Sequence, residues 1–343
     1  MIRLALATEK PDALFIFTDP RFFVWLWEME DEIHQVCPIV YWHVWDNDPY
    51  PDFNNVLYDS NDLINCLSHK TYELVKPHFP EKTNYIPHSL PNDVYFPLPK
   101  NVVEETKKSL LGESRKDHFT GLWINRNARR KMPNDILVSW SLFLDALEKK
   151  HGHRKATLVM HTDPLDQEGP NLLRTVEQFK IIDSVFFSTE RLEFEKINAL
   201  HNISDFCITI SCNEGFGLGT LESMQVGKPI IALKTGGLTR QVVNCNDGSI
   251  NGVALEPDCR DLVGSQNVPY IYEDHISNEK VAAGLMELYE MGPEKRAEIG
   301  AKARVYAQTE FSMNRMVEDW HTTLKETIKN WRKRYSRVSV KSF

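Results

Sequence analysis

Two carboxylates on either side of a glycine-rich segment are the residues of this chain best suited to chemistry. Glu214 and Glu222 have seven residues between them, three of which are glycines. A strand-like run at 206–210 precedes the segment, and a helix-like run follows from residue 221. Backbone N–H groups at a helix start attract anions, and glycine lets a phosphate approach closely. Since carboxylates accept hydrogen bonds from hydroxyls, a nucleotide-sugar suits this combination. The alternative is a helix N-terminus that merely carries acidic residues.

A basic segment could serve the same ligand. Arg126, Arg129, Arg130 and Lys131 follow an apolar run at 119–124. One interpretation is a solvated loop, as for most runs of charge. However, the segment follows a predicted strand, and ligands of α/β sheets bind beyond the carboxyl ends of strands. The guanidinium and ammonium groups could neutralise a diphosphate leaving group without a metal ion.

His43 is a third candidate. It lies where the apolar run 39–44 gives way to Asp46, Asn47 and Asp48. A lone histidine in such a place is more often a hydrogen-bonded structural residue, and its aromatic neighbours suit a core. The structural and the functional interpretation of His43 both remain open from the residues alone.

The elements that must position these residues form two alternating series. In the first series we expect strands at 13–17, 39–44, 56–58 and 63–67 and a helix at 69–76. The proline-rich segment 85–99 reads as an extended linker, which places a domain boundary near residue 98. The second series contains strands at 119–124, 156–160, 184–187, 206–210 and 229–233 with helices at 134–150, 170–179, 190–201 and from about 220. Strands alternating with helices predict a doubly wound α/β domain. The residues 293–335 are expected to be helical.

Composition narrows the class of protein. The 343 residues are enough for two domains, and the formal net charge of −8 argues against a wholly basic nucleic-acid-coating protein. The six cysteines have no C-x-x-C spacing, so we expect reduced thiols. With no signal-peptide layout and no apolar run long enough to span a bilayer, a cytoplasmic location is expected.

Several motifs, in the correct order, resemble those of retaining glycosyltransferases of the GT-B fold, family-4 type (glycosyl transferases group 1). Residues 214–222 resemble the E-x7-E motif of that family, with its E-G-F-G-L core. Arg126 and Lys131 resemble its diphosphate-binding pair, and 227–237 resembles its G-x-P-V-I-A…G-G stretch. The linker 85–97 and Glu310-Phe311-Ser312 resemble further family elements.

The resemblance implies an α/β protein of two Rossmann-like domains. Residues 1–98 would form the acceptor-side domain, which is incomplete because the family's opening strand and glycine-rich loop have no counterpart here. Residues 99–310 would bind the nucleotide-sugar donor. Residues 311–343 would form a helix that crosses back to the first domain and ends in a basic tail.

The resemblance also implies roles for individual residues. Arg126 and Lys131 would hold the donor diphosphate, Glu222 the ribose hydroxyls, and Glu214 the donor sugar at the reacting centre. His43 would also contact the donor sugar. Two further expected donor contacts are the backbone of Gly215, Phe216, Gly217 and Leu218, and Ser188 near the nucleobase. The expected reaction is transfer with retention of configuration, and neither a metal ion nor another cofactor is expected.

Two further departures from the family pattern stand out. Thr239-Arg240-Gln241 occupies the place where the family often has Pro-Glu, which leaves a contact there open. Residues 256–276 form a longer insertion than usual, expected to be a surface loop.

Other functions stay open beside the transferase. One is a nucleotide-sugar-binding protein without transferase activity, and another is a GT-B-like nucleotide-sugar epimerase. The acceptor could be a glycan, a lipid-linked sugar, a protein or a modified nucleic acid. The basic, aromatic tail 329–337 could touch a membrane surface or nucleic acid, or simply end a solvated helix. A second copy of the chain or another partner could complete the first domain.

Overall fold

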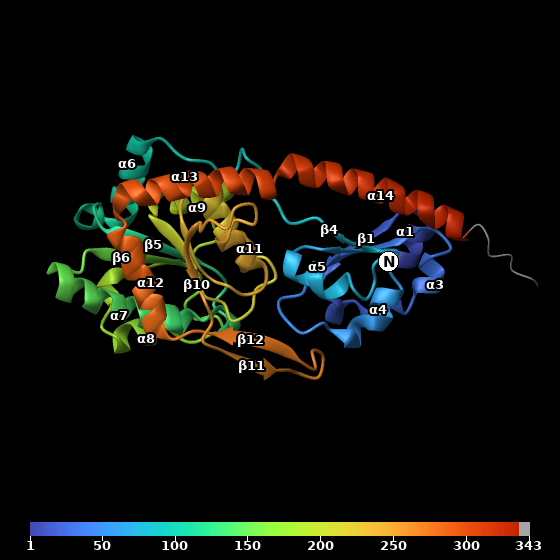
Figure 1. Ribbon diagram of the computed structural model, residues 1–343, viewed down its shortest axis with the longest axis horizontal. Helices are drawn as coiled ribbons and strands as arrows, with labels where there is room; N and C mark the ends of the chain where they lie inside the picture. Colours follow the sequence, from blue (N-terminus) through green and yellow to red (C-terminus); the bar gives the residue numbers. More distant parts are fainter. Residues whose placement is uncertain (336–343) are drawn as a thin grey trace, which may run out of the picture. The chain divides into compact units, whose positions relative to one another are not determined.

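The computed structural model describes residues 1–335, and the chain divides into two compact units (Figure 1). Unit 1 contains Met1–His88, Leu262–Tyr272 and the described residues from Asn314 on. Unit 2 contains Ser89–Asp261 and Glu273–Met313. The first division therefore lies at His88–Ser89, ten residues before the boundary expected near residue 98. Of the predicted basic tail 329–337, residues 336 and 337 lie outside the described part.

Unit 1 is built on a parallel sheet in the order β1-β2-β3-β4. Its strands are β1 (Leu14–Thr18), β2 (Ile39–His43), β3 (Leu63–Cys66) and β4 (Thr83–Tyr85). Its helices are α1 (Ile2–Glu9), α2 (Val24–Trp27), α3 (Glu30–Ile33), α4 (Asn55–Asp59), α5 (His69–Val75) and, from the far end of the chain, α14 (Met313–Tyr335), with short 3-10 turns at Pro20–Phe22 and Asp52–Asn54.

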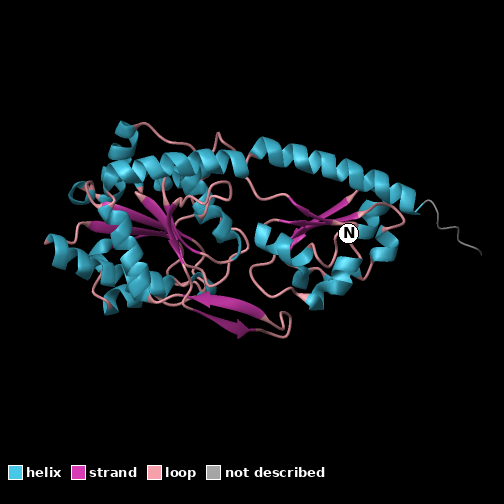
Figure 2. Cartoon of the chain, in the orientation of Figure 1, coloured by secondary structure: helices cyan, strands magenta, loops and turns pink. Residues whose placement is uncertain are grey.

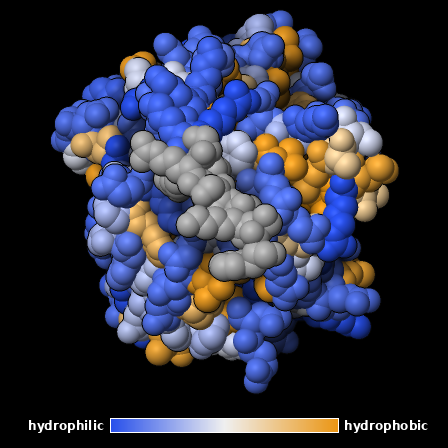
Figure 3. Space-filling view, turned by 90° about the vertical axis from the view of Figure 1, so that its right-hand side faces the viewer, coloured by the Kyte–Doolittle hydropathy of each residue, from blue (hydrophilic) through white to orange (hydrophobic). Residues whose placement is uncertain are grey.

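The two faces of this sheet are covered by different parts of the chain. Residues of α1 to α5, among them Leu26, Ile33 and Tyr58, form one apolar cluster with the sheet. On the other face Trp320 of α14 is buried in a cluster with Val40, Leu63 and Ile86. Figure 3 shows one face of the molecule on which apolar side chains also gather at the surface. The exposed large apolar residues of unit 1 include Leu4, Phe15, Phe17, Phe22 and Trp25.

One predicted strand of unit 1 is wrong. Residues 56–58 belong to helix α4, in which Tyr58 is buried while Val56 is 75% exposed. Three consecutive apolar residues suggest a buried strand, but here Tyr58 is buried, Leu57 packs against the core while partly exposed, and Val56 faces solvent.

Unit 2 holds a six-stranded parallel sheet in the order β10-β9-β8-β5-β6-β7 (Figure 2). Its strands are β5 (Phe119–Ile124), β6 (Ala156–His161), β7 (Val185–Ser188), β8 (Phe206–Thr209), β9 (Ile230–Leu233) and β10 (Gly252–Leu255). The first three strands run outward from β5 and the last three outward from β8. The direction of winding therefore reverses between β5 and β8, which confirms the doubly wound prediction.

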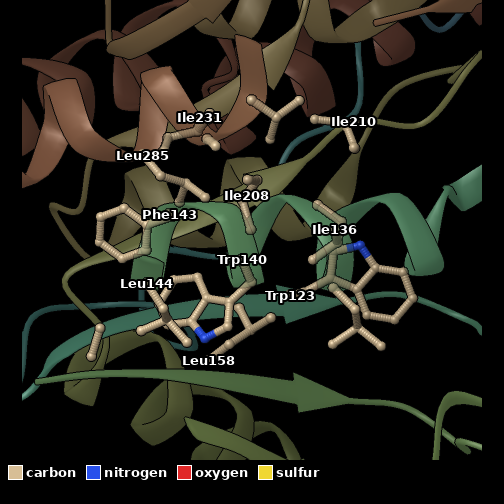
Figure 4. Packing of buried hydrophobic residues seen from close by; sticks show 14 of the residues in the cluster. Trp123, Ile136, Trp140, Phe143, Leu144, Leu158, Ile208, Ile210, Ile231 and Leu285 are labelled. Carbon is tan, nitrogen blue, oxygen red and sulfur yellow. The ribbon is translucent and has the colours of Figure 1, made fainter. Parts of the chain in front are cut away.

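Helices cover both faces of this sheet. One face carries α7 (Pro133–His151), α8 (Leu172–Gln178) and α12 (Asn278–Glu290), and the other carries α6 (Lys100–Leu111), α9 (Phe194–Ile203), α10 (Leu218–Gln225) and α13 (Gly292–Glu310). The short helix α11 (Thr239–Val242) packs by β9, and 3-10 turns lie at Glu113–Arg115, Arg129–Lys131, Ile182–Ser184 and Gly236–Leu238. Figure 4 shows the larger core, where Trp123 of β5 and Trp140 and Phe143 of α7 are all fully buried. This packing makes the sheet a rigid base for the loops at its edge.

The insertion 256–276, expected as a surface loop, is instead a two-stranded hairpin of β11 (Cys259–Val263) and β12 (Ile271–His275). Its tip packs within unit 1: Tyr272 N–H donates to Asp48 O at 2.8 Å, and the Tyr270 ring meets Phe53 edge-on at 5.3 Å. The residues of β11 are largely exposed, so the sequence has no pattern of apolar residues that would predict this strand. Among the described residues, no helix is long and apolar enough to cross a membrane.

Candidate active site

The reversal of winding brings two polar loops together. The loop after β5 carries Arg126 to Lys131, and the loop after β8 carries Cys212 to Gly217. Cys212 N–H donates to Arg130 O at 2.9 Å, and the Arg130 guanidinium donates to Asn213 O at 3.1 Å. Because the neighbouring parallel strands β5 and β8 end at the same edge of the sheet, these two loops lie side by side at that edge.

Lys131 and Glu214 form the centre of this arrangement. The Lys131 ammonium donates directly to the Glu214 carboxylate, and each residue is only 8% exposed. Ser211 Oγ donates to the same carboxylate oxygen at 3.3 Å, and Arg130 Nη1 lies 3.9 Å from it. A buried charge needs a partner of opposite sign, and these two residues supply it to each other. A ligand phosphate that binds Lys131 would therefore compete with Glu214.

Arg126 is engaged on the other side of its loop. Its guanidinium donates to both oxygens of Asp166, at 2.8 and 3.2 Å, and lies 3.1 Å from Glu168. The hydrogen bond to Asp166 raises the pKa of Arg126 and lowers that of the aspartate. The side chain is 58% exposed, so water screens these pairs. The structure thus places Lys131 against Glu214 but directs Arg126 toward Asp166 and Glu168.

The glycine-rich turn is shaped by close backbone contacts. Gly217 has φ 91°, a left-handed conformation that favours glycine, and it directly precedes α10. Gly237 N–H donates to Glu214 O at 2.9 Å. A Cβ on Gly237 would overlap the backbone oxygen of Gly215 and lie 2.7 Å from the Phe216 Cα. The glycine at position 237 thus lets two backbone segments touch beside Glu214.

Gln241 fastens this turn, and sequence reasoning missed it. The fully buried Gln241 amide donates to Phe216 O at 2.7 Å and to Gly217 O at 3.1 Å. Its amide oxygen accepts a hydrogen bond from Thr220 Oγ1 at 2.6 Å. Gln241 lies in the segment that departs from the family's Pro-Glu, so that departure still provides contacts to the glycine-rich turn. Only its proximity in space reveals this role.

Glu222, the second carboxylate, lies on α10 and is held from two sides. Tyr95 Oη donates to one carboxylate oxygen at 3.1 Å, and His201 Nε2 donates to the other at 2.9 Å. Burial, and then the charge of Glu222, raises the pKa of Tyr95, so its hydroxyl stays protonated and donates. Neither Tyr95 nor His201 was expected at the site.

Ser188 ends β7 and pairs with His161 of β6, with His161 Nδ1 and Ser188 Oγ 2.9 Å apart. Burial lowers the pKa of His161, which keeps the ring neutral. The charge of Glu222 acts in the opposite direction and raises the pKa of the same ring. The predicted contact of Ser188 with a nucleobase stays a prediction.

His43 lies in unit 1 and is fully buried. Burial lowers its pKa to about 3, so the ring is neutral. Tyr41 uses its only proton on Thr18 O at 3.3 Å, so His43 Nδ1–H donates to Tyr41 Oη at 3.0 Å and Nε2 accepts from Tyr58 Oη at 2.6 Å. These bonds give His43 a structural role that needs no ligand. The predicted contact with a donor sugar would require one of them to break.

Strand β12 of the hairpin supports both loops of the site. Glu273 accepts hydrogen bonds from Arg129 at 2.6 and 3.0 Å, and Asp274 N–H donates to Cys212 O at 2.7 Å. Thr235 Oγ1 also donates to Asp274, at 2.7 Å. Both acidic residues are at most 4% exposed. The unexpected hairpin is therefore part of the scaffold of the site.

Comparison with known proteins agrees with this geometry. Residues 140–263 match the family model of glycosyl transferases group 1. This part of the chain is therefore similar to group 1 glycosyl transferases. It contains Glu214 and Glu222, whereas Arg126 and Lys131 precede the matched residues.

Two curated relatives are similar to this chain. The N-acetyl-alpha-D-glucosaminyl L-malate synthase of Bacillus anthracis is 25% identical over 217 residues, which are 60% of this chain and 52% of the relative. The trehalose synthase of Pyrococcus horikoshii is 29% identical over 123 residues, 36% of this chain and 24% of the relative. The chain thus matches about half the length of the first relative and about a quarter of the second.

Solved structures match a larger share. HepE of Anabaena, crystallised with UDP and glucose, superposes with a TM-score of 0.71 at 17% sequence identity. The superposition covers 95% of this chain and 81% of the HepE chain. The sucrose-phosphate synthase of Thermosynechococcus elongatus gives 0.67 at 15% identity, over 98% and 77% of the two chains. At such identities the likeness shows the fold, and the expectation of a GT-B fold is confirmed.

Proposed function

We propose that this chain is a group 1 glycosyl transferase, which moves a sugar from a nucleotide-sugar to an acceptor hydroxyl with retention of configuration and without a metal ion. The observation that carries the proposal is the meeting of Lys131, Glu214 and the glycine-rich turn where the unit 2 sheet reverses its winding. One anionic and one hydroxyl-rich ligand group could be bound there together. Neighbours of the same fold crystallised with UDP or UDP-glucose support a nucleotide-sugar as that ligand.

Each residue contributes a distinct step. The diphosphate binds Lys131 and the N–H groups at the start of α10, and it draws Arg126 away from Asp166. As the bond to the sugar breaks, these cations stabilise the negative charge that develops on the leaving diphosphate. Once Lys131 has turned to the phosphate, the Glu214 carboxylate accepts hydrogen bonds from sugar hydroxyls at the reacting centre. Glu222 accepts those of the ribose, while Ser188 contacts the nucleobase.

A ligand screen followed by an assay tests this proposal. UDP-, GDP-, ADP- and CMP-sugars are compared by thermal shift, where a donor at a hundred times its Kd stabilises by about 2.7 kcal/mol. The donor that binds is then incubated with the protein, and the sugar released to water or acceptor is followed by NMR. The proposal expects release with the anomeric configuration of the donor. Release with inverted configuration would contradict retention, an epimerised nucleotide-sugar would indicate the epimerase, and binding without turnover would indicate a binding protein.

A further inference from the structure

The contacts of Glu222 reach beyond the motif that contains it. Three elements meet at its carboxylate: Tyr95 comes from the proline-rich segment, His201 from α9, and Glu222 from α10. Tyr95 is 3% exposed and His201 is 0% exposed, while the Glu222 side chain keeps 14% of its surface accessible. The two donors are therefore buried, while part of the Glu222 side chain reaches solvent.

The proline-rich segment is held in place so that Tyr95 reaches this carboxylate. Asn198 Oδ1 accepts the Phe96 N–H at 3.2 Å, and Asn202 Oδ1 accepts the Leu98 N–H at 2.8 Å. Asn202 Nδ2 also donates to Phe96 O at 3.0 Å. Both asparagines lie on α9, the helix that carries His201, and the Tyr95 ring meets the His201 ring edge-on at 6.1 Å. Helix α9 therefore holds both Tyr95 and His201 in place.

Each oxygen of Glu222 receives one hydrogen bond, one from Tyr95 and the other from His201. A carboxylate offers about four lone-pair sites. Within the described residues, one lone pair on each oxygen thus remains for a ligand, and the direction of both is set by the two donors. Two neighbouring hydroxyls in a fixed geometry match such a pair of acceptors. The two hydroxyls of a ribose have this arrangement, whereas a deoxyribose has lost one.

The environment of His201 points in the same direction. Its Nε2–H donates to Glu222, while Nδ1 is buried and meets no hydrogen-bond partner among the described residues. A buried polar atom without a partner is costly, and a core position alone would favour an apolar residue there. What offsets this cost is therefore the hydrogen bond that His201 Nε2–H donates to Glu222.

We propose that Tyr95 and His201 are positioning residues that aim the Glu222 carboxylate at both ribose hydroxyls and so make the site select ribonucleotides over deoxyribonucleotides. This inference rests on the proposed function, since it takes the ligand of Glu222 to be the ribose of the donor. It adds to that function two residues outside the E-x7-E motif and a source of selectivity.

Paired ligands separate this role from a purely structural one. Calorimetry measures the affinity of UDP and of 2′-deoxy-UDP for the wild type, Tyr95→Phe and His201→Gln, with the ADP and GDP pairs used if they bind more tightly. The wild type should prefer the ribonucleotide by about tenfold or more. Each variant should lose most of this preference by weakening the ribonucleotide more than the deoxy form, which has only its 3′ hydroxyl to lose as a partner of Glu222.

Two matched variants serve as controls. Tyr306→Phe removes a buried hydroxyl that donates to Arg240 O at 2.7 Å, and His118→Gln removes a ring that contacts Thr157 at 2.9 Å. Both should leave the ribose preference as in the wild type. Equal weakening of both ligands in Tyr95→Phe and His201→Gln, or no weakening of either, would overturn the inference and leave the proposed function intact. A wild type that binds none of these nucleotides would overturn the proposed function itself.

Discussion

Replacing Glu214 by glutamine should tighten the binding of a nucleoside diphosphate while it abolishes sugar transfer. In the structure, the Lys131 ammonium donates a hydrogen bond to Glu214, whereas the proposed function has it bind the diphosphate. A ligand must therefore replace one charge-assisted hydrogen bond by another. The substitution removes the competing charge and keeps the size of the side chain.

The structure sets the magnitude. A hydrogen bond between charged groups contributes about 1.5–3 kcal/mol, and both residues are 8% exposed, so water screens the pair little. Arg130 lies 3.9 Å from Glu214, but its side chain is 40% exposed and adds less than about 1 kcal/mol. The glutamine oxygen still accepts a weaker bond from Lys131, which takes back part of the gain. A net gain near 1.4 kcal/mol corresponds to about tenfold tighter binding.

Titration calorimetry with UDP measures the affinity, and hydrolysis of the donor identified by screening measures the chemistry. The matched control is Glu298→Gln on α13, a carboxylate paired with Lys295 and Lys302 at 2.8 Å, which should change neither quantity. Unchanged or weaker UDP binding by Glu214→Gln would refute the competition between Glu214 and phosphate for Lys131. Unchanged turnover would refute the role of Glu214 at the sugar.

Three further substitutions test other parts of the site and its scaffold. Asp166→Asn removes the bidentate partner of Arg126 and should tighten UDP binding a few-fold at most, because exposed ion pairs contribute up to about 1 kcal/mol; calorimetry showing weaker binding would contradict this. Gln241→Leu removes the amide that donates to Phe216 O and Gly217 O, although Gly217 O still accepts from Thr220 Oγ1 at 2.8 Å. It should lower the free energy of unfolding by about 1–3 kcal/mol, measured by urea denaturation, whereas a loss below about 0.5 kcal/mol would show that the turn needs no such support. His43 has a pKa of about 3 when folded and 6.5 as the ordinary value, so only the unfolded chain takes up its proton between these values and stability falls as pH falls. The wild type should therefore lose about 2 kcal/mol more than His43→Gln between pH 6.5 and pH 5, and identical losses would contradict the buried neutral ring.

Much of unit 2 could be predicted from sequence because its buried parallel strands are nearly continuous apolar runs. The run 206–210 and strand β8 differ by one residue, and 134–150 and helix α7 by one residue at each end. Elements that bury little could not be predicted in this way. The hairpin strand β11 exposes most of its side chains, and α4 buries only Tyr58.

In the candidate site, too, some residues could be predicted from the sequence and others could not. Glu214 and Glu222 stand in a motif whose spacing is visible in the sequence, and the structure brings Lys131 to the first of them. The partners that fix these carboxylates are distant in sequence: Tyr95 lies 127 residues before Glu222. A glutamine or tyrosine carries no local signal of such a contact, because the contact exists only once the helices have packed. His43 illustrates the converse, since the residues left two interpretations open and burial with two hydrogen bonds accounts for it structurally.

The position of α14 in unit 1 has a consequence for synthesis of the chain. Trp320 covers the sheet face formed by Val40, Leu63 and Ile86, but it is made roughly 230 residues after Ile86. At about 5–20 residues per second, the ribosome needs on the order of 10–50 s for that interval. During this time the nascent β2–β3 face lacks its helix and exposes apolar side chains, while all of unit 2 is completed first. Unit 1 is therefore the first to be started and the last whose core can be completed. A chain stopped before Asn314 would leave the apolar face of its sheet exposed and prone to aggregation.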